Sequence, residues 1–143
     1  MDLLKAWGAA AGAWLVGGIL MLVLFLNVPS VQLMQSLGGR ILISYLPSLL
    51  LIVLMAALAA LVHPRPARDN PTRHVLAVAA VPAVSTIAGL ISGVSAGTTV
   101  ENAIATLLIG VIGTLAGWRL VAVVRARRST PDGPSMFPYG HKA

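Results

Sequence analysis

The stretch from Ile41 to Val62 reads ILISYLPSLLLIVLMAALAALV and contains no charged residue. A helix needs about 20 predominantly apolar residues to cross the hydrocarbon core of a bilayer, and this stretch is long enough. Three further apolar stretches of similar length surround it in the chain: Ala6–Val28, Val75–Val94 and Asn102–Val124. The sequence therefore predicts an all-α polytopic membrane protein with four transmembrane helices.

The composition indicates that lipid is the solvent of these helices. Hydrophobic residues make up 57% of the 143-residue chain and charged residues only 10%, about half of the charged fraction of a typical soluble domain. The net charge is +6, but the cations flank the apolar stretches, so we expect no nucleic-acid partner. The chain has no cysteine, which excludes disulfides and thiolate-based metal or catalytic sites.

Lysine and arginine are distributed unequally over the connections between the stretches. If both termini share one side, nine of the ten cations fall on that side: Lys5, Arg65, Arg68, Arg73, Arg119, Arg125, Arg127, Arg128 and Lys142. Only Arg40 falls on the other side. The positive-inside rule then predicts a multi-pass protein of the inner (plasma) membrane with both termini in the cytoplasm. We also expect Ala6–Val28 to be retained as a helix, because no small-residue cleavage site follows it.

The chain is expected to form one domain followed by a tail. Residues 1–128 contain the four spans, and residues 129–143 are rich in proline, glycine and serine. Such a segment cannot bury enough apolar surface to fold alone, so we predict a flexible cytoplasmic tail. The connection between the third and fourth spans is very short, which predicts that these two spans form a tight antiparallel hairpin.

Small residues recur at helical spacing in the last two spans. The third span contains Gly89 and Gly93, and Gly97 follows four residues later. In the fourth span the series is Thr106, Gly110, Gly113 and Gly117. Helices associate in lipid where small residues let their backbones approach closely. We therefore predict that these seven are helix-packing residues of a glycine-rich hairpin, although either series could instead face another copy or a different subunit.

The ends of the spans carry residues that are typical of helix caps and membrane interfaces. Thr98 and Glu101 have the spacing of a capping box at the start of the fourth span. Trp7 and Trp118 are predicted to be interface anchors, because an indole can keep its ring in lipid and its N–H in water. Arg119 is a third predicted anchor, since its long side chain can extend to the interface.

The second span contains a proline, and two histidines flank the loop that follows it. Pro47 should distort the second span, and the hydroxyl of Ser44 or Ser48 could then cover the freed carbonyl groups. His63 and His74 flank the basic loop between the second and third spans, and two histidines on neighbouring helices could ligate a haem or a metal. Because they lie at the rim of the membrane, we expect no cofactor and no metal.

No set of residues identifies a reaction, so we expect no enzyme and no catalytic residue. The leading hypothesis is a small accessory or assembly subunit of a larger inner-membrane complex, in contact with lipids and with other subunits or copies of itself. The small size, the glycine-rich last two spans and the basic tail resemble phage holins, and a self-assembling, membrane-permeabilising protein is the alternative. A small transporter is disfavoured, because the spans lack a buried charge and a broken helix facing a cavity.

Overall fold

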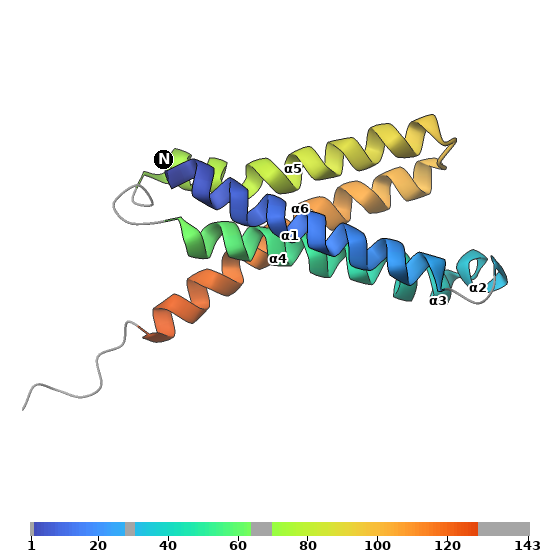
Figure 1. Cartoon of the computed structure of the whole chain (residues 1–143), viewed down its shortest axis with the longest axis horizontal. Helices are drawn as coiled ribbons and strands as arrows, with labels where there is room; N and C mark the ends of the chain where they lie inside the picture. Colours follow the sequence, from blue (N-terminus) through green and yellow to red (C-terminus); the bar gives the residue numbers. More distant parts are fainter. Residues whose placement is uncertain (1, 28–30, 64–69, 129–143) are drawn as a thin grey trace, which may run out of the picture.

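The computed structural model describes residues 2–27, 31–63 and 70–128 (Figure 1). These ranges are helical and contain four helices that are long and apolar enough to cross a membrane: Leu3–Leu26, Leu37–Val62, Thr72–Ser95 and Val100–Arg127. Each overlaps one of the four predicted spans, which confirms the prediction of an all-helical chain with four potential membrane helices. The predicted tail lies outside the described residues.

The second of these helices contains a wider turn. In chain order the helices are α1 (Asp2–Leu26), α2 (Val31–Gln35), α3 (Leu37–Gly39), η1 (Arg40–Tyr45), α4 (Leu46–Val62), α5 (Pro71–Ser95) and α6 (Val100–Arg128). The η1 segment is a π-helix that continues directly into α4. It ends two residues before Pro47, whose ring would clash with the carbonyl group four residues earlier in a regular α-helix. The distortion expected at Pro47 therefore takes the form of a π-helical turn.

A glycine turn connects α5 to α6. Gly97 has a φ angle of +73°, a conformation that favours glycine over residues with a Cβ atom. The N–H of Thr98 donates to the carbonyl of Gly93 at 2.9 Å, and the N–H of Gly97 donates to that of Val94 at 3.0 Å. This pattern is the Schellman motif that ends many helices. Gly97 is thus a turn residue and not the helix-packing residue that its spacing suggests, because nothing lies within 4 Å of its Cβ position. At Gly93, a Cβ atom would meet Thr98 at 3.4 Å.

The cap of α6 is shifted by one residue from the predicted position. The Oγ1 atom of Thr99 accepts a hydrogen bond from the N–H of Asn102 at 3.4 Å, so Thr99 occupies the capping position that we predicted for Thr98. The Glu101 carboxylate lies 3.7 Å from the guanidinium group of Arg40. This ion pair connects the start of α6 to the start of η1. It is largely exposed on the Glu101 side, so we expect it to contribute at most about 1 kcal/mol to stability.

The central helix of the bundle is α4, which packs against α1, α5 and α6. It supplies most of the buried apolar side chains: Ile52, Met55, Ala56, Ala57, Ala59 and Ala60. Figure 1 shows α5 and α6 side by side at their turn and diverging away from it, with the second half of α6 crossing toward α4. The extensive contact between α4 and α6 means that the fourth span does not pair with the third alone.

Candidate functional site

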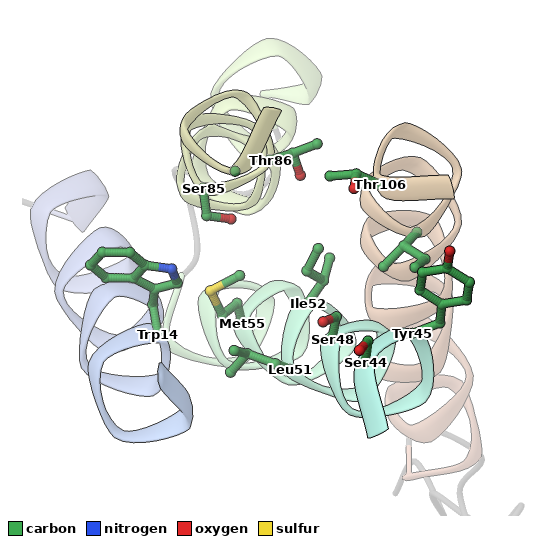
Figure 2. Close-up of a pocket in the computed structure, with 12 residues that line it drawn as sticks. Trp14, Ser44, Tyr45, Ser48, Leu51, Ile52, Met55, Ser85, Thr86 and Thr106 are labelled. Carbon is green, nitrogen blue, oxygen red and sulfur yellow. The ribbon is translucent and has the colours of Figure 1, made fainter. Parts of the chain in front are cut away.

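A polar cavity lies where the four spans meet (Figure 2). Its volume is about 270 Å³. The lining residues are Trp14 of α1, Ser44 and Tyr45 of η1, Ser48, Leu51, Ile52 and Met55 of α4, Ser85, Thr86 and Gly89 of α5, and Thr106 and Ile109 of α6. Six of these side chains carry a hydroxyl group, in a protein whose spans are otherwise strongly apolar. The cavity therefore brings together hydroxyl groups from three of the four spans.

Three of the hydroxyl groups donate to the backbone of their own helix. Ser85 Oγ and Thr86 Oγ1 each donate to the carbonyl of Pro82 at 2.8 Å, and Thr106 Oγ1 donates to the carbonyl of Asn102 at 2.8 Å. A hydroxyl that donates in this way keeps its lone pairs as acceptors. Figure 2 shows the oxygens of Ser85 and Thr106 directed into the space between the helices. This side of the cavity thus offers hydrogen-bond acceptors.

The opposite side of the cavity offers donors. Ser44 and Ser48 were expected to cover carbonyl groups freed by Pro47, but within the described residues their hydroxyls make no hydrogen bond. They are available to a molecule in the cavity. Tyr45 closes the adjoining wall, because its hydroxyl donates to Oδ1 of Asn102 at 2.6 Å and so connects η1 to α6.

An apolar groove between α1 and α5 adjoins the cavity. Its volume is about 420 Å³. The residues that line it are Trp7, Ala11, Trp14, Ala80, Val81, Val84, Ser85 and Ala88. Trp14 and Ser85 line both spaces, and Figure 2 shows the indole nitrogen of Trp14 on the side of the ring that faces the cavity. Cavity and groove therefore meet at these two residues.

The first part of the α6 small-residue series faces α5. A Cβ atom on Gly110 would lie 2.5 Å from Oγ1 of Thr86, and one on Gly89 would lie 3.9 Å from Cγ2 of Thr106. A side chain at Gly110 would therefore require the side chain of Thr86 to move. Near the turn, the two helices thus approach each other through residues that we predicted for helix packing.

The second part of the series faces α4 instead. A Cβ atom on Gly113 would lie 2.8 Å from Cγ2 of Ile52. One on Gly117 would contact the carbonyl oxygen of Val53 and lie 2.8 Å from Cβ of Ala56. Gly113 and Gly117 therefore pack on the second span, where we had predicted the third. At Gly117 the physical reason is that the small side chain of Ala56 lets the α6 backbone approach α4 closely.

No family model matches the sequence, and no curated protein or solved structure matches it significantly. The remaining residues singled out in the sequence lie at the end of the bundle where α1 begins and α4 ends.

The two tryptophans predicted as anchors make contacts inside the bundle. Trp7 Nε1 donates to the carbonyl of Leu76 at 3.2 Å, which connects α1 to α5. Trp118 meets the ring of His74 edge-on, with centroids 6.2 Å apart. Arg119 is exposed. Anchoring in the membrane interface stays a prediction for all three predicted anchors.

The two histidines at the rim are brought together. Their rings stack with centroids 5.6 Å apart and an angle of 23° between the planes. His63 is 1% exposed, and neither of its ring nitrogens has a hydrogen-bond partner among the described residues. The described chain contains no group of three or more histidine, cysteine, aspartate or glutamate residues that could hold a metal ion. The loop between the histidines lies mostly outside the described residues.

Arg125 connects α6 to the end of α4. Its Nη2 atom donates to the carbonyl of Ala60 at 2.8 Å and to that of Leu61 at 3.0 Å. These carbonyls belong to the last turn of α4, where the backbone acceptors of a helix lack partners within the helix. A cation is also favoured there by the helix dipole. From the sequence, Arg125 was predicted only as one of the cytoplasmic cations, and this contact was not predicted.

Proposed function

We propose that this protein is a small, non-catalytic accessory or assembly subunit that packs within a larger complex of the inner membrane. The observation that carries the proposal is an open small-residue face on α1. Gly8 and Gly12 lie one helical turn apart on this face, and a Cβ atom at either would meet nothing within 4 Å. Ala6 and Ala10, on the opposite face, are fully buried. One small-residue face of α1 is thus used inside the chain, and a second is open to a neighbouring helix.

The behaviour of helices in lipid supports this use of the open face. Against lipid chains alone, leucine or valine would serve as well as glycine. Small residues four positions apart instead let two backbones approach and accumulate van der Waals contact. We therefore expect a membrane helix of another subunit, or of a second copy, to pack on Gly8 and Gly12.

The hydroxyl groups of the cavity support a role without turnover. Ser85 and Thr86 both donate to the carbonyl of Pro82, so the backbone engages their protons. A serine or threonine nucleophile needs an adjacent general base. The described residues that line the cavity include no histidine, lysine, aspartate or glutamate.

Purification from source membranes in mild detergent tests the proposal. We expect the tagged protein to retain a defined set of other membrane subunits in fixed proportion. Gly8→Leu and Gly12→Leu should lose them, because the larger side chain blocks close approach. Gly18→Leu is the matched control: this glycine is also exposed with nothing within 4 Å of its Cβ position, but it lies on a different side of α1.

The holin-like alternative gives a different result in the same preparation. The protein would then copurify only with itself, and a potential-sensitive dye would report abrupt depolarisation once it accumulates in bacteria. That pair of results would overturn the proposed subunit role. Retention of the same partners by all three glycine variants would exclude the α1 face as the contact.

We further propose that both termini face the cytoplasm. In Figure 1, the start of α1 and the end of α6 lie toward one end of the bundle, and the α5–α6 turn lies toward the other. Lys5 and Arg125 belong to the first of these ends, whereas the Arg40–Glu101 ion pair belongs to the second. Cations are retained on the cytoplasmic side of a membrane protein, which supports this orientation.

Reporter fusions test the orientation. Alkaline phosphatase is active only outside the cytoplasm, so fusions after residue 35 or 98 should be active. Fusions after residue 70 or 135 should be inactive. Activity of the fusion after residue 70 would contradict the proposed topology, because that position follows the second span.

A further inference from the structure

We infer that the polar cavity and the α1–α5 groove together form a binding site for an uncharged amphiphile that is dissolved in the membrane. The compact hydrogen-bonding head occupies the cavity, and the apolar chain lies in the groove. This inference is independent of the proposed assembly role, which rests on the open face of α1 that carries Gly8 and Gly12.

The chemistry of the cavity determines the head of the ligand. Ser44 and Ser48 supply donors, and Ser85 and Thr106 supply acceptors, so a head that both accepts and donates hydrogen bonds is matched. The described lining residues carry no ionised group. A charged head would therefore lose its hydration without gaining a counter-charge, which is costly inside a membrane. With about 270 Å³, the cavity lies at the small end of ligand pockets and suits a compact head.

The position of the cavity favours a ligand from the membrane interior. Trp14 lies near the middle of the span Leu3–Leu26 and Ser85 near the middle of Thr72–Ser95, while Ser44 and Thr106 lie about two helical turns inside the ends of their spans. Phospholipid headgroups stay at the interface, outside the hydrocarbon core. An uncharged phenol or alcohol on an apolar chain, such as a prenylated quinol or an acylglycerol, both accepts and donates hydrogen bonds and can reach this depth.

The groove supplies the path and the place for the chain. Apart from Ser85, its lining is alanine, valine and tryptophan. Trp14 is 45% exposed and Val84 is 66% exposed, so the groove is accessible from the side of the bundle that faces lipid in a membrane. Because Trp14 and Ser85 line both spaces, a chain in the groove leads directly to a head in the cavity.

Tryptophan fluorescence provides the assay, because the full-length chain has three tryptophans and Trp14 lies at the junction. Trp118→Phe removes the tryptophan that lines neither space and leaves Trp7 and Trp14, which both line the groove, as reporters. A short-chain prenylated benzoquinone, which quenches indole fluorescence and can accept hydrogen bonds from Ser44 and Ser48, is titrated into the reconstituted protein. We expect saturable quenching that a monoacylglycerol relieves by competition. The lysophosphatidic acid of the same chain length adds only a charged phosphate and should compete at least about tenfold more weakly.

Substitutions in the cavity separate binding from partitioning into the bilayer. Ser48→Leu should abolish saturable quenching by filling the cavity, and Ser48→Ala should weaken it several-fold by removing one donor while keeping the space. Ser95→Leu is the control, because Ser95 is exposed and donates only to the carbonyl of Ile91. Quenching that rises linearly and equally in every variant would overturn the inference. Equal competition by lysophosphatidic acid, or by hexadecane, would also overturn it, since either result removes the need for an uncharged polar head.

Discussion

Replacing Gly117 with alanine is expected to destabilise the bundle by about 1–3 kcal/mol. The new Cβ atom would contact the carbonyl oxygen of Val53 and approach Cβ of Ala56 to 2.8 Å. A flexible side chain could move aside, but the first of these atoms belongs to the backbone of α4. The two helices must therefore separate, and they lose the van der Waals contact that holds helices together in lipid. Leucine at the same position should be more disruptive.

The matched control for this substitution is Gly18→Ala. Nothing lies within 4 Å of the Cβ position of Gly18, so alanine there should leave stability unchanged or raise it through its higher helix propensity, by at most about 1 kcal/mol. Both substitutions gain the same helix propensity, so the difference in stability between the two variants isolates the contact between α4 and α6. Thermal unfolding in mild detergent, followed by circular dichroism, measures it. Equal unfolding temperatures for the two variants would refute close packing at Gly117.

Arg125→Gln should cost the bundle about 1–2 kcal/mol, because it removes two hydrogen bonds from a charged donor. The wild-type side chain spans from α6 to the carbonyls of Ala60 and Leu61, and the shorter glutamine cannot reach both. The expected cost lies toward the lower end of the range for hydrogen bonds from charged donors, because Arg125 is only half-buried and water can partly replace the contact.

Arg127→Gln removes the same charge from the same helix end and serves as the control. Arg127 is exposed, so we expect its replacement to change stability by less than about 0.5 kcal/mol. The same unfolding assay applies, and the phosphatase fusions described above show whether either loss of charge alters the topology. A similar loss of stability in both variants would mean that charge at this end, and not the cap on α4, is what stabilises the bundle.

The spans could be predicted from sequence because a single local property determines them. A membrane helix has to satisfy its backbone internally and be apolar for about 20 residues, so its length and composition identify it without knowledge of its neighbours. The same reasoning does not determine which helices are neighbours. The spacing of Gly110, Gly113 and Gly117 indicates one small face, but the face is divided between α5 and α4 in the structure. In a span rich in leucine, the sequence does not mark Ala56, Ala57 and Ala60 as a packing surface, yet α6 packs on them.

The sequence placed the cap of α6 one residue away and did not predict the cavity, for related reasons. Thr98 and Thr99 are chemically identical candidates for the cap. A capping box at Thr98 would need the N–H of Thr98 as the donor to the Glu101 carboxylate, but that N–H already donates to the carbonyl of Gly93 in the turn at Gly97. The cavity depends on hydroxyl groups from η1, α4, α5 and α6. No spacing within one helix predicts that these groups converge, and only the packing of the four helices brings them together.

The contact between α4 and α6 joins two spans that are not consecutive, and this has a consequence for the growing chain. Roughly 55 residues separate Val62 from Gly117, so at about 5–20 residues per second the alanine face of α4 waits roughly 3–11 s for its partner to be synthesised. In water, such a delay would invite aggregation. Acyl chains can cover this face at little cost in a bilayer. A nascent chain can therefore pause with three helices inserted, and the arrival of the fourth is the step that closes the structure.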